Sequence, residues 1–297
     1  KLYCNNTEVS DVAISYLSNY TFADCVSLKS VTIKGDRVTS IERCAFGGCK
    51  NLTNITIPDS VTSIREYAFS GCESLTNISI PESVTIGNSV TSIEGSAFAY
   101  CSSMKSVVIP HGISIIEGGT FEGCYSLTNV QIPNSVTAIR PCAFRHCASL
   151  ANILIPNGVT SIGWDAFRGC SHLKSVALPN SITSIDEGAF YGCDELEAFY
   201  GKFSSSDNRC LVINGTLMAI APAGLTEFSI SDNVTSIGRN AFSECSLVGI
   251  TIPESVTEIK YHSFSFCHNL TNVTIPSTVI SIGDYAFAYC GSLTSVE

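Results

Sequence analysis

One pattern of apolar and polar positions recurs along nearly the whole chain. Residues 52–58, Leu-Thr-Asn-Ile-Thr-Ile-Pro, alternate apolar and polar side chains from Asn54 onward, which is typical of a half-buried strand. We expect this strand to end at Pro58, because proline cannot donate to a β-ladder. Residues 61–64, Val-Thr-Ser-Ile, predict a second short extended segment. Residues 68–72, Ala-Phe-Ser-Gly-Cys, are too few for an α-helix and favour a single helical or 3-10 turn.

A phenylalanine followed three positions later by a cysteine marks each copy of this pattern. One copy cannot bury its own apolar face, so we expect stacked copies to form a continuous core, in about twelve coils. The phenylalanines recur mostly every 23 residues, and 11 of the 15 cysteines follow them. These phenylalanines are Phe22, Phe46, Phe69, Phe98, Phe121, Phe144, Phe167, Phe190, Phe242, Phe264 and Phe287, and their cysteines are Cys25, Cys49, Cys72, Cys101, Cys124, Cys147, Cys170, Cys193, Cys245, Cys267 and Cys290.

Two coils are longer than the others. The first contains a partial duplication near residues 84–90, which we expect to form a bulging loop. The second replaces its phenylalanine turn with apolar runs on either side of Asn214-Gly215, and this predicts a β-hairpin insertion near residues 203–222. The hairpin either fills the space left by the missing turn or protrudes as a contact element. The chain stops inside a strand at Glu297, so we interpret residues 1–297 as one array truncated at its C-terminus.

The repeat resembles the BspA-type leucine-rich repeat of surface proteins from anaerobic bacteria and some parasitic protists. The matching residues are Ile57-Pro58, 60–64 (Ser-Val-Thr-Ser-Ile), Ala68-Phe69 and 71–75 (Gly-Cys-Glu-Ser-Leu). The fold class expected is α/β: a leucine-rich-repeat solenoid with one curved parallel β-sheet of short strands, and helical or 3-10 turns on the other side. The resemblance implies a secreted or surface-anchored protein that binds macromolecules, and it carries over no catalytic residue.

Charge limits the classes of partner. The formal net charge is −10, and only 14 % of residues are charged. Nucleic-acid binding requires clustered Lys and Arg, so we expect no nucleic-acid partner. No apolar run approaches the length of a membrane span, so we expect no direct membrane insertion. The partner that the resemblance implies is a surface or matrix protein, or a glycan, of a host or a neighbouring cell.

The cysteines do not predict disulfides. Equivalent cysteines of adjacent coils would lie one strand spacing apart, but their Cα–Cβ bonds would run parallel rather than toward each other. We therefore expect reduced thiols in the core, where cysteine acts as a small apolar residue. Cys4, Cys44, Cys142 and Cys210 lie off this pattern, and surface-facing thiols or local irregularities are favoured over bridges for them.

No motif predicts an enzyme, a metal site or a cofactor. The five histidines have no metal-binding spacing. Ser102 and Lys105, like Ser171 and Lys174, match a Ser-x-x-Lys nucleophile pattern, but the repeat itself places them there. Trp164 is the only tryptophan, and it is either an exposed interaction anchor or a half-buried spacer on the convex side.

One column of exposed strand positions departs from the repeat and is a candidate partner surface. The column holds Thr or Ser in the outer coils but five other residues in the middle: Val108, Gln131, Leu154, Ala177 and Tyr200. Four of these five can present apolar surface on adjacent strands, and contiguous apolar surface commonly marks an interaction site. The alternatives are drift toward common β-forming residues, coverage by an insertion, or an array that serves only as a structural spacer.

Overall fold

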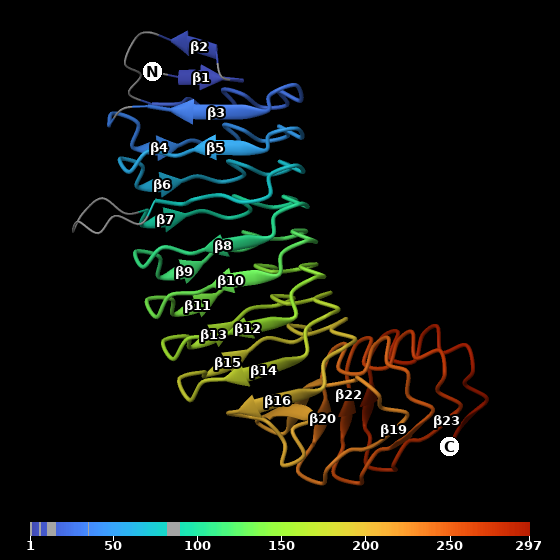
Figure 1. The fold of residues 1–297 in the computed structure, drawn as a ribbon. Helices are drawn as coiled ribbons and strands as arrows, with labels where there is room; N and C mark the ends of the chain where they lie inside the picture. The colour runs from blue at the N-terminus through green and yellow to red at the C-terminus, as the bar shows by residue number, and fades with distance from the viewer. Residues whose placement is uncertain (1, 6, 11–15, 35, 82–89) are drawn as a thin grey trace.

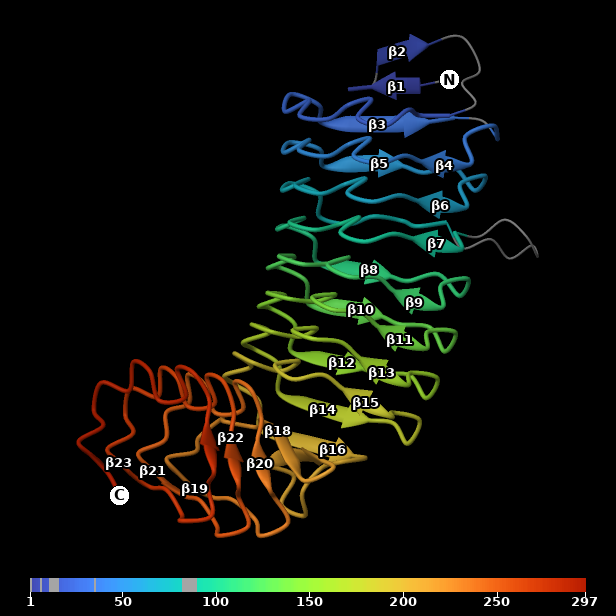
Figure 2. The same cartoon turned by 180° about the vertical axis from the view of Figure 1, so that it is seen from behind.

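The chain folds into two stacks of coils joined by a hairpin, as Figure 1 shows. The computed structural model describes residues 2–5, 7–10, 16–34, 36–81 and 90–297, and the loop expected near residues 84–90 falls, but for Val90, outside them. The N-terminal stack comprises residues 16–201 and the C-terminal stack residues 225–297. The two stacks run in different directions, so the molecule is bent (Figures 1 and 2).

The longer strands of most successive coils pair in parallel and in register. In each except the terminal strand of the C-terminal stack, the second residue is buried or nearly so and the residues on either side of it are more exposed, as the alternating pattern predicts. In the N-terminal stack this row comprises β3 (Ser30–Ile33), β5 (Asn54–Thr56), β8 (Ser106–Val108), β10 (Asn129–Gln131), β12 (Asn152–Leu154), β14 (Ser175–Leu178) and β16 (Ala198–Gly201). In the C-terminal stack it comprises β19 (Glu227–Ser229), β21 (Gly249–Thr251), β23 (Asn272–Thr274) and β25 (Ser295–Val296).

A second row of two-residue strands forms another parallel face of each stack (Figure 2). Within the N-terminal stack it comprises β4 (Ser40–Ile41), β6 (Ser63–Ile64), β7 (Ser92–Ile93), β9 (Ile115–Ile116), β11 (Ala138–Ile139), β13 (Ser161–Ile162) and β15 (Ser184–Ile185). Within the C-terminal stack it comprises β20 (Ser236–Ile237), β22 (Glu258–Ile259) and β24 (Ser281–Ile282). The second extended segment expected from the sequence is therefore present, but it belongs to a face of its own.

At the N-terminal end, an antiparallel hairpin lies against the longer strands. β1 (Leu2–Cys4) pairs antiparallel with both β2 (Thr7–Ser10) and β3. An unpaired edge strand is a template for association with other chains. Because β1 pairs with the outer edge of β3, that edge is not available for such association.

The expected α/β class with helical or 3-10 turns is wrong, because the described residues contain strands and turns but no helix. The turn around Phe69 gives the reason. Tyr67 and Gly71 have φ angles of 56° and 73°, and such left-handed residues cannot continue a helix. The N–H groups of Phe69 and Gly71 donate forward to the carbonyls of Ala97 and Ala99 in the next coil, each at 2.8 Å. Each turn therefore bonds to the next coil, and the fold is a β-solenoid.

The phenylalanines of the turns form a stacked column through each core, which we call the phenylalanine ladder. Phe144 is fully buried, and its ring centroid lies 5.5 Å from that of Phe121 and 5.4 Å from that of Phe167. The planes of these neighbouring rings are within 11° of parallel. Offset stacking of this kind adds to the stabilisation from burial alone. The ladder confirms the repeat register deduced from the sequence.

The core is not continuous, because the buried side chains form two clusters that meet at the junction hairpin. This hairpin consists of β17 (Cys210–Ile213) and β18 (Thr216–Ile220), paired antiparallel around the Asn-Gly turn. Leu211 packs in the N-terminal core, whereas Leu217 packs in the C-terminal core, and both are fully buried. β18 also pairs in parallel with β20 and so begins the short-strand row of the C-terminal stack.

Candidate interaction surfaces

The apolar stripe, defined as Val108, Gln131, Leu154, Ala177 and Tyr200, occupies the last or next-to-last position of adjacent long strands. Val108 pairs with Gln131, Leu154 with Ala177, and Ala177 with Tyr200. All five side chains are exposed, and Leu154, at 76 % of its full accessible area, is among the most exposed apolar side chains described. The structure therefore brings the five sequence-selected residues together on one surface that the junction hairpin does not cover.

The surroundings of the stripe are small and polar. The preceding exposed position of the same strands holds residues such as Asn129, Asn152 and Ser175. In the outer coils the stripe's own column returns to Thr56 and Thr251. The stripe is thus an apolar region with a polar border on an otherwise uniform sheet, which is the usual arrangement of an interaction patch.

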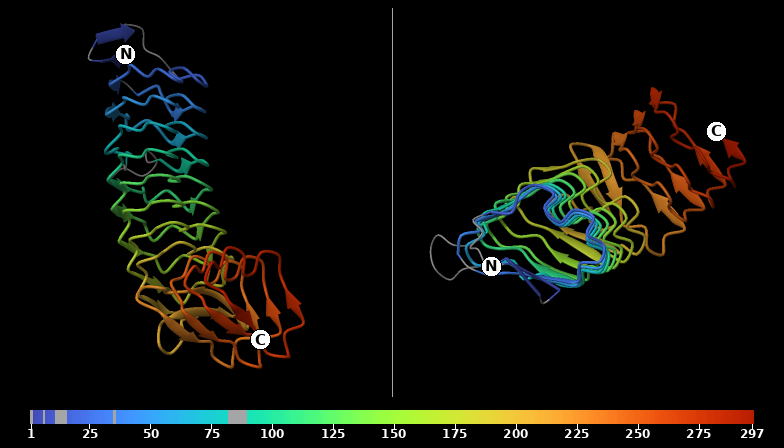
Figure 3. Two further views of the ribbon diagram at one scale, coloured as in Figure 1. Left: turned by 90° about the vertical axis from the view of Figure 1, so that its right-hand side faces the viewer. Right: turned by 90° about the horizontal axis from the view of Figure 1, so that it is seen from above.

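A second surface lies inside the bend, where the turns of the two stacks meet (Figure 3). Glu187 Oε1 lies 2.7 Å from Lys260 Nζ, and the two residues come from different stacks. Tyr191 also donates its hydroxyl proton across the junction, to Glu244 Oε1 at 2.7 Å. Burial, reinforced by that hydrogen bond, raises the pKa of Tyr191 to about 12, so it stays a proton donor at neutral pH.

Trp164 belongs to this junction. The guanidinium carbon of Arg239, in the C-terminal stack, lies 5.7 Å from the Trp164 ring and 4.8 Å from the Tyr261 ring. Arg239 therefore lies between an aromatic residue of each stack, within the range of cation–π attraction. The indole is partly exposed at 38 %. Trp164 is thus an anchor between the two parts of this chain.

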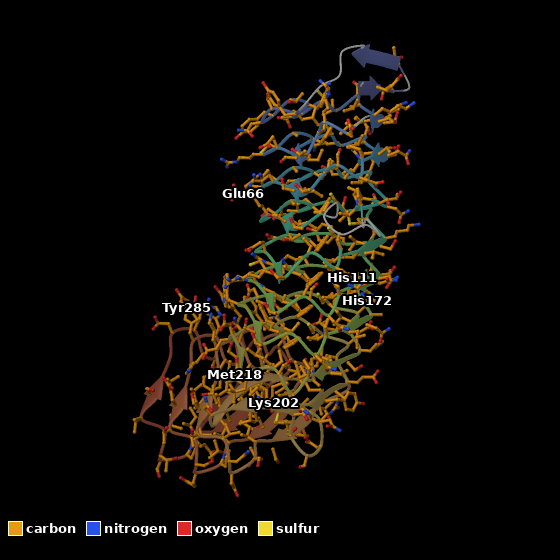
Figure 4. The ribbon with its side chains drawn as sticks, turned by 90° about the vertical axis from the view of Figure 1, so that its left-hand side faces the viewer. Glu66, His111, His172, Lys202, Met218 and Tyr285 are labelled. Atoms are coloured by element: carbon orange, nitrogen blue, oxygen red, sulfur yellow. The ribbon has the colours of Figure 1, made fainter. Side chains whose placement is uncertain are left out.

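Two side chains of the junction, Lys202 and Met218, contact the base of the N-terminal stack, and Figure 4 labels both. Lys202 Nζ donates to the backbone carbonyls of Asn180 and Ile182, at 3.3 and 2.6 Å. Met218 packs against the N-terminal core. A β-bulge between Leu211 and Val212 accompanies this packing, and it lets Met218 and Ala219 face the same core.

The 14 cysteines whose side chains the structure describes are all free. Most are buried, and most turn cysteines donate to a carbonyl of the preceding coil rather than facing one another. Cys25 is exposed and Cys290 only partly buried, because each lies near the end of a stack. Cys44 and Cys142 are partly exposed, whereas Cys210 is buried in the junction hairpin, and all three are free rather than bridged.

The described residues contain no cluster of three or more His, Cys, Asp or Glu side chains arranged for a metal ion. Lys174, from one Ser-x-x-Lys match, pairs with Glu195 Oε2 at 2.7 Å, and Ser102, from the other, donates to the carbonyl of Glu73. Ser171 Oγ lies 3.4 Å from Nδ1 of His172, but the same nitrogen lies 2.8 Å from the Ala148 carbonyl. A ring nitrogen that donates to a carbonyl carries a proton, so it does not serve as a base for Ser171. A helix that is long and apolar enough to cross a membrane is also absent from the described residues.

A family model for the BspA-type leucine-rich repeat region matches residues 15–90, 82–197 and 221–297, in six copies. The chain belongs to this family. The resemblance deduced from the Phe-x-x-Cys and Ile-Pro positions is confirmed, and the gap in the match contains the junction hairpin. Among curated proteins, none matches the chain in sequence.

Solved structures of bacterial leucine-rich repeat proteins resemble this BspA-type array. A leucine-rich repeat protein from Bacteroides ovatus is 27 % identical, with a TM-score of 0.64 over 96 % of this chain and 76 % of that chain. A leucine-rich cell surface protein from Faecalibacterium prausnitzii is also 27 % identical, with a TM-score of 0.66 over 97 % of this chain and 85 % of that one. The pneumococcal vaccine antigen PcpA, at 15 % identity and a TM-score of 0.55 over 95 % of this chain and 67 % of that one, shares the fold.

Proposed function

We propose that this protein is a non-catalytic recognition protein of the cell surface or the extracellular space, and that it binds a protein or glycan partner through the apolar stripe. The observation that carries the proposal is the stripe itself. Leu154 and Tyr200 are exposed at positions where the repeat elsewhere has threonine or serine. Burying exposed apolar surface contributes about 25 cal/mol per Å² to association, and a solvent-exposed Leu or Tyr has no comparable role in folding.

The resemblance to a cell surface protein of Faecalibacterium prausnitzii supports the proposed location. The net charge of −10 disfavours an anionic partner such as nucleic acid. A structural spacer is the alternative function. A spacer has no reason to vary one exposed column in five adjacent coils, and it would bind no partner through that column.

The test is a binding screen followed by a paired mutation. The intact wild-type protein is screened for binding to purified matrix proteins and immobilised glycans. Leu154→Thr combined with Tyr200→Thr should then weaken binding by at least tenfold while leaving the melting temperature nearly unchanged, since threonine fits a strand. The matched control is Val26→Thr combined with Tyr125→Thr, because both residues are exposed but lie off the stripe. Binding at full strength by the stripe variant would refute the proposal, as would the absence of any ligand from the screen.

A further inference from the structure

The turn-to-turn hydrogen bonds stop where the two stacks meet. In the last regular pair of turns, Phe167 N–H donates to the Ala189 carbonyl at 2.8 Å and Gly169 N–H to the Tyr191 carbonyl at 2.7 Å. The next donors in this series are the N–H groups of Phe190 and Gly192. Among the described residues, no carbonyl accepts from either group. The repeat geometry directs both donors away from their own stack, toward the C-terminal stack.

The facing wall carries the complementary acceptors. In the regular coils, carbonyls such as that of Ala189 accept from the preceding turn. The equivalent carbonyls at the start of the C-terminal stack are those of Ala241 and Ser243. No backbone N–H of the described residues donates to them. The thiol of Cys245 also lacks its usual acceptor in the preceding coil, and its contact within hydrogen-bond range is the Ser243 carbonyl, at 3.9 Å.

Between these walls lies a cleft of about 560 Å³, which we call the junction cleft. Its lining includes the donor residues, the acceptor residues and part of the junction hairpin. The volume falls within the range of about 300–1,000 Å³ that is usual for ligand sites. The cleft marks the place where a coil lacks its Ala-Phe-x-x-Cys turn.

The aromatic position of the missing turn is already filled. Phe199 packs edge-on against Phe190, with the centroids 5.3 Å apart, and Phe228 packs edge-on against Phe242 at 5.7 Å. Both come from the centre of a long strand, where the other coils have Val or Ile. Phe199 and Phe228 therefore cover the ends of the phenylalanine ladder. What the cleft still offers to a ligand is its unpaired backbone groups and its charged side chains.

The charge of the cleft is negative. Asp194 and Glu244 line it from opposite stacks, and burial together with the nearby Glu244 carboxylate raises the pKa of Asp194. Neither carboxylate forms an ion pair within the described residues. The guanidinium of Arg168 stacks 4.8 Å from the Tyr191 ring beside the cleft, rather than bridging the two carboxylates. A basic side chain in the cleft would relieve the repulsion between Asp194 and Glu244.

We propose that the junction cleft binds a short peptide segment of a partner protein that carries a basic side chain. The backbone of the segment takes the place of the missing turn: its carbonyls accept from Phe190 and Gly192, and its N–H groups donate to Ala241 and Ser243. Its Lys or Arg lies between Asp194 and Glu244. Addition of a backbone segment to unpaired backbone groups is an established mode of peptide recognition. The site is separate from the apolar stripe, so each proposal can fail without the other.

The probe is acetyl-Ala-Ala-Arg-Gly-Ala-amide, which copies the chain's own turn at residues 166–170 with alanine in place of the phenylalanine and the cysteine. Isothermal titration or NMR should detect its binding to the intact protein. A peptide with Glu in place of Arg should bind at least tenfold more weakly, as should one with N-methylated backbone amides. Binding should weaken with increasing salt, because ionic screening reduces charge attraction at an exposed site.

Two protein variants locate the site. Glu244→Gln retains a hydrogen-bond acceptor for Tyr191 but removes a charge, and it should weaken probe binding about tenfold. Asp24→Asn, at the same repeat position in the first coil, is its matched control. Ser246→Trp places a large ring at the cleft and should abolish binding, whereas Ser102→Trp, at the equivalent position of another coil, should not. No binding at millimolar probe, or equal binding by the Arg and Glu peptides, would overturn the proposal. Unchanged affinity in both cleft variants would do the same.

Discussion

The thiol of Cys147 lies 3.2 Å from the carbonyl oxygen of Phe121 in the preceding coil. The same carbonyl accepts the backbone N–H of Cys124, also at 3.2 Å. The thiol therefore uses a second lone pair of an oxygen that is already bonded within its own turn. Cysteine suits this position because it is small and apolar, yet has one weak donor. Burial raises the pKa of the Cys147 thiol well above its usual range.

The arrangement predicts how the thiols react. Only the thiolate is nucleophilic, and a raised pKa leaves less thiolate at pH 8, so buried thiols should react slowly. Iodoacetamide at pH 8 should label Cys25 readily and Cys44, Cys142 and Cys290 partially, while the buried thiols remain unlabelled. After denaturation without reductant, the buried thiols should all become labelled. Mass spectrometry distinguishes the two patterns, and several coil-to-coil disulfides in the denatured sample would contradict the expectation.

Phe144→Ala should be strongly destabilising. The residue is fully buried between two stacked rings, and its removal should cost about 3–5 kcal/mol of unfolding free energy through the cavity it leaves. Phe287→Ala is the control at the end of the ladder, where the ring is only partly buried and stacks on Phe264 alone, and it should cost roughly 1–2 kcal/mol. Urea denaturation measures both. A loss below about 1 kcal/mol for Phe144→Ala would mean that the ladder contributes little to the core.

The junction hairpin should stabilise both stacks through opposite faces. Leu211→Ala should loosen the N-terminal core and Leu217→Ala the C-terminal core, each by about 2–5 kcal/mol. Hydrogen exchange followed by mass spectrometry would locate the loss in each variant. Both cores losing protection equally in both variants would show that the stacks unfold as one unit instead.

Replacing the hairpin coil by a regular 23-residue coil should also destabilise the protein, because Leu211 and Leu217 would both be lost from their cores. A thermal melt of that variant is the measurement. A hairpin that served only as a contact element would give a different result: unchanged melting together with loss of partner binding.

Asp194→Asn should make the protein more stable at neutral pH. The folded-state pKa of Asp194 is raised above its ordinary value of 3.8, chiefly by burial and then by Glu244. A raised carboxyl pKa means that the folded state binds the proton more tightly than the unfolded state does. The stability that the protonated Asp194 carboxyl contributes is therefore present below about pH 3.8 and is lost as pH rises through the folded-state pKa. Asparagine never ionises. The melting temperature of the variant should therefore exceed that of wild type at pH 7, and the difference should vanish near pH 3. Asp232→Asn, an exposed position, is the control, and an equal gain there would refute the local explanation.

The sequence predicted the repeat, its strands and its core because these depend on apolar spacing. It could not predict the turns. Non-glycine residues such as Tyr67 and Cys142 adopt left-handed conformations there, at φ angles of 56° and 59°, which residue preferences disfavour. Hydrogen bonds to the next coil compensate for this cost, and such long-range bonds leave no local signal in the sequence.

The sequence does contain a signal of the junction, in the buried column of central strand residues, that the repeat pattern alone did not identify. The column of central strand residues holds Val or Ile in ten coils but phenylalanine at Phe199 and Phe228, on either side of the missing turn. Two aromatic residues at adjacent places in an otherwise uniform column indicate that the core changes there. The direction of the bend was not predictable, because it depends on contacts such as Glu187 with Lys260, which lie 73 residues apart. The five residues of the apolar stripe were found because exposure follows from strand alternation alone.

The forward direction of the turn hydrogen bonds has a consequence for how such a chain can lengthen. Each coil with the phenylalanine turn offers donors to its successor and acceptors to its predecessor, as Phe69 does with Ala97. A coil thus has a donor side and an acceptor side. Duplication of a whole period always places the donor side of one coil against the acceptor side of the next. Any two coils that contain the phenylalanine turn are interchangeable in this respect, whatever their exposed side chains. Selection can then alter the exposed side chains of one coil while the backbone hydrogen bonds to its neighbours stay the same.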